Sequence, residues 1–287
     1  MIHIKCYRYL IRFVFLYFLV FSAMADIHEH CQGQGPLIYL IGGGPAFTTW
    51  NLQPIQDRLS KRYRVCRWDM RGVGDNAGLR IDQHKPLLSQ WIEDMRNVLP
   101  PQPVVLWGHS WGALQVLLYA KSYPDHVSKA VLSNPVDPEL TSLEHIERKR
   151  FVHRSQKGNQ LQLKDIDTAV EKRHSLRSKI ASYFVDAELG WNYANQFAQS
   201  DMNSELNVRI WKDYTLSPLT KADVRQLADK VRGVIYCQYD LLQPENLDAY
   251  KPLLKNSKHH MLAECGHFPW VENPDAYYKA LLKLIDE

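Results

Sequence analysis

Short apolar runs alternate along the chain with amphipathic stretches. Polar, glycine or proline residues bound each run, which is typical of strands buried on both faces of a parallel sheet. The predicted strands are Leu37–Ile41, Tyr63–Trp68, Val104–Trp107, Lys129–Ser133, Gly233–Tyr239 and Lys258–Leu262. Helical spacing of apolar residues predicts helices near 52–61, 88–98, 112–123, 245–254 and 274–285. This alternation predicts an α/β fold with a mostly parallel sheet.

Residues 137–228 interrupt the alternation, because they contain no strong strand run and are rich in Lys, Glu, Gln and Ala. We expect this segment to be a mostly helical cap inserted between two core strands, with the core formed by residues 26–136 and 229–287. Residues 144–179 within the cap carry ten Lys/Arg and five Asp/Glu. Such a run usually forms a solvated helix face, and the alternative is attraction of an acidic substrate or an anionic surface.

The amino-terminal segment has a different pattern. Lys5, Arg8 and Arg12 precede the apolar run 13–21, and Ala23-Met24-Ala25 follows it. This order predicts a secretory signal peptide at residues 1–25, cleaved after Ala25, and export to the periplasm or beyond. The alternative is a retained anchor, but the apolar run is shorter than the roughly 20 residues that a spanning helix needs.

Composition and charge narrow the class of protein. Hydrophobic residues make up 45% of the 287 residues, which excludes a mainly disordered chain. The net charge is +4, and three of the basic residues lie in the predicted signal peptide. The mature chain is therefore nearly neutral. We expect a small-molecule or short-peptide substrate, no nucleic acid and no stable membrane span after cleavage, and the oligomeric state stays open.

The segment Gly108-His109-Ser110-Trp111-Gly112 follows an apolar strand and precedes a predicted helix. This is the context that a G-x-S-x-G nucleophile turn requires, since the sharp turn projects the serine hydroxyl at the strand tip. Ser110 is therefore the predicted nucleophile. We expect its neighbour His109 to be structural, because a residue in a tight turn cannot easily face its own serine.

A serine hydroxyl needs a base to take its proton. His267 follows a glycine in the loop after the last strand, where α/β proteins place active-site groups. It is preferred over His259 and His260, which lie at the start of that strand. An acid should come between serine and histidine in the chain, and Asp240 follows the strand 233–239. Asp137 is the alternative acid.

The loop Ile41-Gly42-Gly43-Gly44-Pro45 follows the first core strand. Its glycines allow a backbone N–H to point toward a reacting carbonyl, so we expect it to form part of an oxyanion hole. Trp111 supplies one N–H as the residue after the nucleophile, and Gly44 supplies the other, with Gly43 as the alternative. A plain tight turn also fits the loop, whereas a phosphate-binding loop lacks the required G-K-[ST].

These motifs together resemble the α/β-hydrolase superfamily. The landmarks occur in the expected order: Gly42-Gly43-Gly44-Pro45, Asp69-Met70-Arg71-Gly72-Val73-Gly74, Gly108–Gly112 and Gly266-His267. The resemblance implies that Asp69 and Arg71 are structural. It is strongest to the proline iminopeptidase branch, which implies release of an amino-terminal residue, with cap carboxylates holding the substrate ammonium.

The chain departs from that branch at three positions. Gly42 stands where a histidine commonly opens the oxyanion loop, Ala46 replaces a glycine, and Asp75 replaces a serine. The cap contains acids, but none in the amine-binding motif of the branch; they are Asp186, Glu188, Asp201, Glu205 and Asp213.

Only eleven residues separate Ala25 from Leu37, so we expect the first hairpin of the superfamily to be missing or reduced, leaving about six core strands. The implied sheet order places the strand of Cys66 near an edge, where the segment with Cys31 could run beside it. Cys237 and Cys265 follow neighbouring strands. In an oxidising compartment these residues predict the disulfide pairs Cys31–Cys66 and Cys237–Cys265.

The predicted function is a serine hydrolase that cleaves an amide or ester through an acyl-enzyme. A proline-iminopeptidase-like aminopeptidase, a carboxylesterase or lipase-like enzyme, and a non-turnover ligand-binding homologue are the alternatives. No cofactor is expected, and no cluster with metal-ligand spacing lies in the core. The mature terminus Asp26-Ile27-His28, with His30 and Cys31 nearby, could bind Cu(II) or Ni(II) through its amine, two amide nitrogens and the imidazole of His28.

Overall fold

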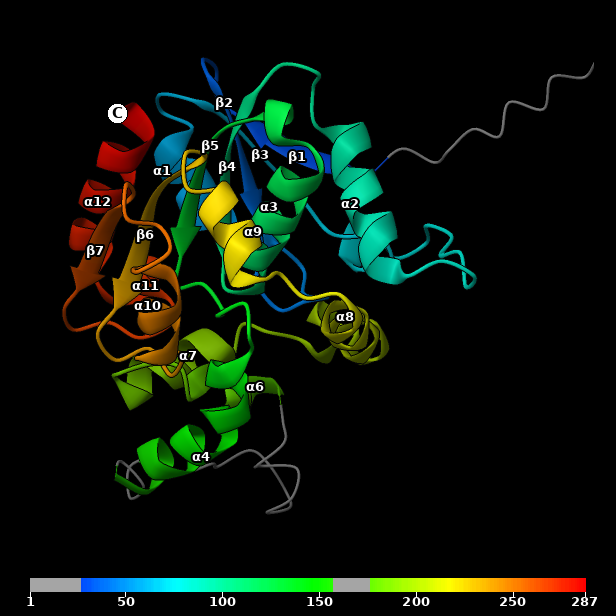
Figure 1. Cartoon of the computed structure of the whole chain (residues 1–287). Helices are drawn as coiled ribbons and strands as arrows, with labels where there is room; N and C mark the ends of the chain where they lie inside the picture. Colours follow the sequence, from blue (N-terminus) through cyan, green and yellow to red (C-terminus); the bar gives the residue numbers. More distant parts are fainter. Residues whose placement is uncertain (1–26, 157–175) are drawn as a thin grey trace, which may run out of the picture.

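The computed structural model describes residues 27–156 and 176–287. In these residues one sheet has the strand order β1-β3-β2-β4-β5-β6-β7 (Figure 1). Its neighbouring strands run parallel, except that β1 is antiparallel to β3. The strands are β1 (Glu29–Gln32), β2 (Leu37–Ile41), β3 (Arg64–Trp68), β4 (Val104–His109), β5 (Val127–Ser133), β6 (Val231–Cys237) and β7 (Lys258–Leu262). The predicted α/β fold with a mostly parallel sheet is confirmed.

Helices cover both faces of the sheet (Figure 1). The core helices are α1 (Gln53–Leu59), α2 (Leu87–Val98), α3 (Trp111–Ser122), α10 (Glu245–Tyr250), α11 (Pro269–Glu272) and α12 (Pro274–Asp286). The helices between β5 and β6 are α4 (Thr141–Gln156), α6 (Leu176–Ala181), α7 (Ala187–Ala194), α8 (Ser204–Leu216) and α9 (Lys221–Gln226). The helix predicted near 245–254 is shorter in the structure, since α10 ends at Tyr250.

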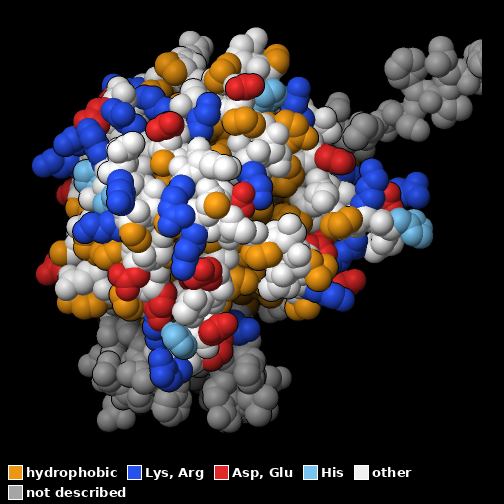
Figure 2. All heavy atoms as spheres, in the orientation of Figure 1, with side chains coloured by type: hydrophobic (Ala, Val, Ile, Leu, Met, Phe, Trp, Pro, Cys, Tyr) orange, Lys and Arg blue, Asp and Glu red, His pale blue; other side chains and the backbone are white. Residues whose placement is uncertain are grey.

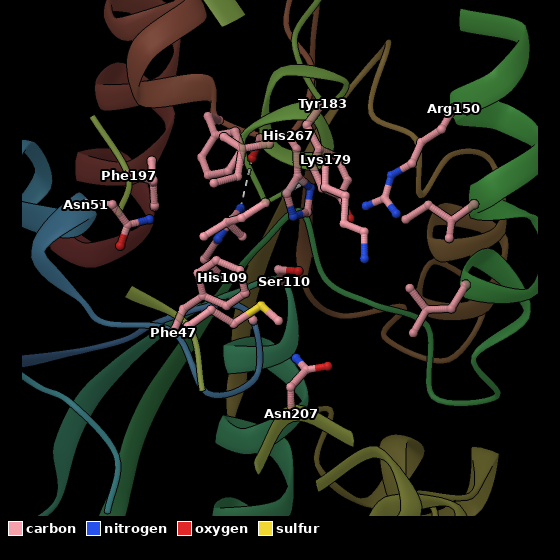
Figure 3. Close-up of a pocket in the computed structure, with 18 of the residues that line it drawn as sticks. Phe47, Asn51, His109, Ser110, Arg150, Lys179, Tyr183, Phe197, Asn207 and His267 are labelled. Atoms are coloured by element: carbon pink, nitrogen blue, oxygen red, sulfur yellow. Dashed lines mark hydrogen bonds between the residues drawn. The ribbon is translucent and has the colours of Figure 1, made fainter. Parts of the chain in front are cut away.

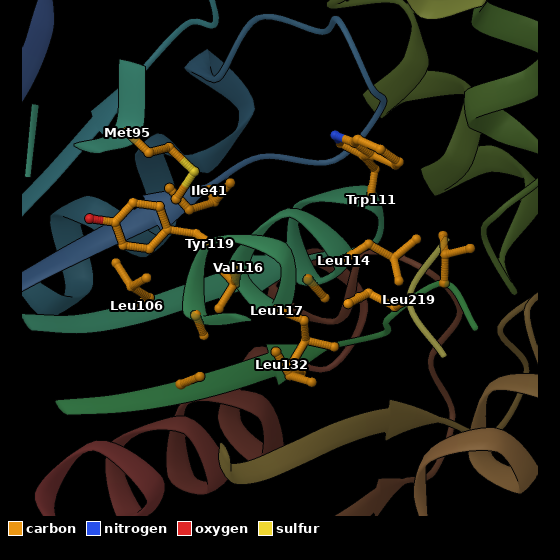
Figure 4. Close-up of a cluster of buried hydrophobic side chains, with 14 of the residues drawn as sticks. Ile41, Met95, Leu106, Trp111, Leu114, Val116, Leu117, Tyr119, Leu132 and Leu219 are labelled. Carbon is orange, nitrogen blue, oxygen red and sulfur yellow. The ribbon is translucent and has the colours of Figure 1, made fainter. Parts of the chain in front are cut away.

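Successive residues of a buried strand point to opposite faces of the sheet, so β4 contributes to two cores. Leu106 packs under α2 and α3 in the cluster shown in Figure 4, which also contains Leu117 and Leu132. Trp107 packs on the other face with residues of α1 and α12. Each large apolar side chain buried in this way contributes roughly 1.5–3 kcal/mol. The two cores hold the tip of β4, and hence Ser110, in a fixed position.

The described sheet has seven strands where about six were expected, because β1 adds an edge strand. Its sequence, Glu-His-Cys-Gln, lacks the apolar run that reveals a buried strand. Pairing with β3 defines it instead, with Cys31 opposite Cys66 in the register. A four-residue connection leads back to β2, and Gly33 adopts a φ of 83° in it. A Cβ on Gly33 would lie 2.3 Å from the carbonyl oxygen of Tyr63, so the turn requires glycine.

Both predicted disulfide pairs are present in the structure. Cys31–Cys66 joins β1 to β3, and Cys237–Cys265 joins the end of β6 to the loop after β7. The second bond therefore links the two strand ends that are followed by Asp240 and His267.

The helices α4, α6, α7 and α8 lie beyond the carboxyl ends of the strands, and we call them the cap helices (Figure 1). Helix α9 lies beside α3 instead. Lys121 of α3 and Asp223 of α9 form an ion pair at 2.9 Å, which fixes α9 to the core. Acidic and basic side chains are interspersed on the face that Figure 2 shows, so no patch of one sign covers it. None of the helices in the described part of the chain is long and apolar enough to span a bilayer.

Candidate active site

Ser110 occupies the turn between β4 and α3. Its φ is +55°, a left-handed conformation that a side chain rarely adopts. A Cβ on Gly112 would lie 2.2 Å from the carbonyl oxygen of Ile41, and a Cβ on Gly108 would lie 2.5 Å from that of Gly112. Both glycines are therefore required for the close approach of three backbone segments. The predicted strand, turn and helix around Ser110 are confirmed.

The oxyanion loop lies beside this turn because of the strand order. β2 is the first core strand in the chain, with β3 on one side and β4 on the other. Ligands of open α/β sheets bind at such a point, outside the carboxyl ends of the two strands. A Cβ on Gly43 would lie 3.1 Å from Cβ of Ser110, so this loop contacts the serine directly. The amino terminus of α3, which begins at Trp111, adds unpaired N–H groups and a positive dipole end.

His267 and Asp240 are in contact. The Nδ1 atom of His267 lies 3.0 Å from Oδ2 and 3.1 Å from Oδ1 of Asp240. The side chain of His267 is 4% exposed and that of Asp240 is fully buried. The backbone N–H of Leu242 also donates to Asp240 Oδ1 at 3.1 Å. Because a carboxylate can only accept hydrogen bonds, it favours the tautomer of His267 that carries the ring proton on Nδ1. The Nε2 atom is then free to accept a proton from another group.

Ser110 and His267 line one cavity of about 280 Å³ between the strand ends and the cap helices (Figure 3). Gly43, Gly44 and His109 also line it from the core. The remaining lining residues come from both sides and are mostly apolar: Phe47, Asn51, Leu143, Ile146, Arg150, Leu176, Lys179, Ile180, Tyr183, Phe197, Met202, Asn207, Trp211 and Phe268. The predicted nucleophile, base and oxyanion loop thus share one enclosed space.

His109 has a function that the sequence did not reveal. Its Nε2–H donates to the backbone carbonyl of His267 at 2.8 Å, so it holds the loop that carries that histidine. Burial lowers the pKa of His109 well below its ordinary value, and the neighbouring His267 adds to this effect. His109 is therefore a neutral donor that positions His267. The prediction that it is structural holds, although the residue also lines the cavity.

Tyr183, between α6 and α7, joins the cap to His267. Its backbone carbonyl accepts from the N–H of His267 at 3.0 Å, and its ring stacks on the imidazole with ring centres 4.4 Å apart. A Cβ on Gly266 would lie 2.1 Å from that carbonyl oxygen, which explains the glycine before His267. No sequence motif marks Tyr183, because only the packing of the cap brings it to the site.

Glu272 of α11 ties the same two segments together. Its Oε1 accepts from the N–H of Val185 at 2.7 Å, and its Oε2 accepts from the N–H of Gly266 at 2.8 Å. Burial raises the pKa of Glu272 to about 7, outweighing these backbone hydrogen bonds, which lower it. The carboxyl group thus connects the cap to the loop of His267 without facing the cavity.

The alternative acid and bases lie elsewhere. Asp137 accepts from the backbone N–H groups of Thr141 and Ser142 at the start of α4, at 2.7 and 2.9 Å. The ring of His259 contacts the carbonyl of Leu254 and the hydroxyl of Tyr236. None of the three alternatives, Asp137, His259 and His260, lines the cavity with Ser110.

The cap acids that the sequence singled out do not line the cavity either. Asp186 caps the amino terminus of α7. Asp201 accepts a hydrogen bond from the hydroxyl of Thr48, and Asp213 accepts one from the backbone N–H of Leu88. Glu188 and Glu205 are exposed. Of the described residues, the charged cap side chains that reach the cavity are Arg150 and Lys179, which are both basic.

The structure also bears on the predicted metal site at the terminus. Asp26 lies outside the described residues, and the backbone N–H of His28, which would have to lose its proton to bind the metal, donates to Asn76 Oδ1 at 2.8 Å. The ring of His28 instead groups with His30 and Asp75, and the ligand atoms of the three residues lie within 4.8 Å of one another. Cys31 is disulfide-bonded and cannot join them as a thiolate.

Comparisons with known proteins identify the fold family. The model of the alpha/beta hydrolase fold family matches residues 36–274. Proline iminopeptidase from Clostridioides difficile is 23% identical over 91% of this chain and 92% of its own length, and that from Heyndrickxia coagulans is 22% identical over 86% and 89%. The structure of a meta-cleavage product hydrolase from Pseudomonas fluorescens covers 90% of this chain and 93% of its own with a TM-score of 0.67 and 16% identity.

Proposed function

Because the chain belongs to the α/β-hydrolase fold family, we propose that it is a serine hydrolase with Ser110 as nucleophile, His267 as general base and Asp240 as the acid that orients His267. The observation that carries this proposal is the convergence of these side chains from three strand ends. Ser110 and His267 line one cavity, and Asp240 holds His267 from behind at 3.0 Å.

In the first half of the reaction, Nε2 of His267 takes the proton of the Ser110 hydroxyl as Oγ bonds to the substrate carbonyl carbon. The carbonyl electron pair moves to the oxygen. The backbone N–H groups of Trp111 and of Gly44, with Gly43 as the alternative, stabilise this oxyanion. When the carbonyl re-forms, the bond to the leaving group breaks and the leaving group takes the proton from His267. Water then repeats both steps on the acyl-enzyme.

Among the possible substrates, the lining favours a carboxylic ester over an amino-terminal peptide. An aminopeptidase must hold a substrate ammonium, and a carboxylate is the usual partner of such a cation. The lining that the described residues supply has Arg150 and Lys179 and no acid. The identity to two proline iminopeptidases favours the aminopeptidase as the second candidate.

We also propose that the protein is exported after cleavage at Ala25. The two disulfide bonds support export, because such bonds persist in oxidising compartments. Amino-terminal sequencing of the protein from its natural host tests this proposal. A chain that begins at Asp26 supports it, and a chain that still carries the first 25 residues contradicts it.

Two measurements test the hydrolase. A fluorophosphonate should label the protein at Ser110, and Ser110→Ala should abolish both labelling and hydrolysis of 4-nitrophenyl butyrate while leaving the thermal midpoint close to that of the wild type. Turnover of proline 4-nitroanilide but not of the ester would select the aminopeptidase. A folded protein that the fluorophosphonate does not label, and that hydrolyses neither substrate, would be a non-turnover binding protein.

A further inference from the structure

Two basic side chains lie in the cap wall of the cavity, among mostly apolar residues. Arg150 extends from α4 and Lys179 from α6, and Figure 3 shows both pointing from the cap side toward the space above Ser110. Both belong to the basic run at 144–179, for which an acidic substrate was the alternative interpretation. The cavity that these residues line contains no Asp or Glu among the described residues.

Arg150 is buried, and its hydrogen-bonding capacity is only partly used. One guanidinium nitrogen donates to Glu147 at 2.6 Å, but 69% of the Glu147 side chain is exposed, whereas 9% of the Arg150 side chain is. The guanidinium carbon lies 4.9 Å from the ring centre of Tyr183, and Nε is buried with no acceptor among the described residues. A buried guanidinium with an unused N–H is costly unless an acceptor arrives.

Lys179 adds a second positive charge at the same wall. Its side chain is half-buried, and no acidic side chain of the described residues pairs with its Nζ. Two cations that share an apolar cavity repel each other more strongly than they would in water, because the effective dielectric constant is lower there. An anion bound between them would offset both the repulsion and the desolvation of Arg150.

Arg150 also lies close to the proposed base. Tyr183 stacks on the guanidinium of Arg150 and on the imidazole of His267, so a single ring separates the two. Ser110, Arg150 and Lys179 line the same cavity, so a ligand that reaches from Ser110 to the two cations can stay within it. Guanidinium and ammonium groups bind carboxylates through charge-assisted hydrogen bonds.

From this geometry we infer that the substrate is an ester that carries a free carboxylate, which Arg150 and Lys179 bind while its ester carbonyl lies at Ser110. This inference rests on the proposed hydrolase function. It specifies the substrate class. The substrate it predicts is anionic, whereas an aminopeptidase would take a substrate with a cationic ammonium group.

The test compares esters that differ in one charge. Mono-4-nitrophenyl adipate is paired with 4-nitrophenyl 6-methylheptanoate, in which an isopropyl group replaces the carboxylate. 4-(Butyryloxy)benzoate, with the carboxylate on the leaving group, is paired with 4-isopropylphenyl butyrate. After subtraction of spontaneous hydrolysis, we expect kcat/KM for the anionic member of at least one pair to exceed that of its neutral partner tenfold or more.

The preference should depend on the two cations. Arg150→Gln and Lys179→Gln should each reduce the anionic-to-neutral ratio of kcat/KM about tenfold, as expected for loss of one charge-assisted hydrogen bond. Lys212→Gln, which removes an exposed lysine of α8, is the matched control and should keep the wild-type ratio. Competitive inhibition of neutral ester turnover by adipate measures the same site in the unaltered protein, so the test stands even if Arg150→Gln fails to fold.

Equal rates within both pairs, together with no inhibition by adipate, would overturn the inference and leave the hydrolase proposal intact. A preference for proline 4-nitroanilide would overturn it as well. Absence of all ester turnover and of fluorophosphonate labelling at Ser110 would instead overturn the proposed function itself, so the two failures are distinguishable.

Discussion

The ring of Tyr183 stacks on the imidazole of His267, with ring centres 4.4 Å apart and ring planes 24° apart. The same tyrosine accepts the backbone N–H of His267 at 3.0 Å. A residue of the cap therefore holds the proposed base by its ring and by its main chain, whereas Asp240 holds it at Nδ1. The geometry of the base depends on both the cap and the core.

Tyr183→Ala should remove the ring contact but keep the backbone hydrogen bond. Aromatic pairs of this kind contribute about 0.5–1.5 kcal/mol, so we expect kcat to fall about two- to tenfold through misplacement of His267. Tyr183→Phe keeps the ring and is the matched control. Steady-state kinetics on a neutral ester, with the thermal midpoint measured alongside, checks this. Equal losses in both variants would refute a role for the stacked ring.

Asp240→Asn should nearly abolish turnover. An amide cannot hold the proton on Nδ1 of His267, so the imidazole turns to the wrong tautomer, and we expect kcat to fall on the order of 10³- to 10⁴-fold. The matched control is Asp137→Asn, because Asp137 caps α4 and does not contact His267. It should cost stability, about 1 kcal/mol or less, and leave kcat largely intact. A large loss of kcat in the control alone would reverse the assignment of the acid.

The two disulfide bonds should contribute differently to activity. Each closes a loop of about thirty residues, so replacing either cysteine pair by alanine should lower the free energy of unfolding by roughly 2–4 kcal/mol. Only the Cys237–Cys265 pair joins the strand ends that lead to Asp240 and His267, so its loss should also lower kcat. The Cys31–Cys66 double variant is the control and should retain kcat. Chemical denaturation measures the loss of stability in each variant, and steady-state kinetics measures kcat. Equal kcat in both variants would contradict this prediction.

The buried carboxyl of Glu272 should make stability depend on pH. Burial raises its pKa from 4.5 to about 7 in the folded protein, so folding favours the protonated form. The resulting stabilisation is full below pH 4.5 and is lost as the pH rises through 7. We expect the free energy of unfolding of the wild type to decline over this interval relative to that of Glu272→Gln, which does not titrate.

Denaturant titrations at several pH values between 4 and 8 measure this difference. Glu188→Gln, which alters an exposed acid of α7, is the control and should reproduce the wild-type slope. Parallel curves for the wild type and Glu272→Gln would show that Glu272 is not the group responsible.

The sequence predicted the parts of the site that depend on local backbone geometry. The turn at Ser110 was predictable because Gly108 and Gly112 must be small for three segments to approach, and the loop of His267 because Gly266 has no room for a side chain beside Tyr183. Asp240 followed from chain order. These features lie within a few residues of a strand end.

What the sequence did not predict depends on contacts between distant segments. The four residues of β1 have no apolar pattern, and only their pairing with β3 makes them a strand. Arg150, Lys179 and Tyr183 look like ordinary residues of polar helices, and the fold of the cap alone brings them to one cavity. The hydrogen bond from His109 to His267 joins residues 158 positions apart, so no local motif could reveal it.

The order of the proposed catalytic residues along the chain has a consequence for how activity arises during synthesis. Ser110 lies before the cap in the chain, whereas Asp240 and His267 lie after it. A growing chain that has already formed the turn at Ser110 still lacks the base that takes up its proton and the acid that orients this base. On the proposed mechanism the nucleophile therefore has no base until synthesis has passed His267 and the loop after β7 has folded against the turn at Ser110.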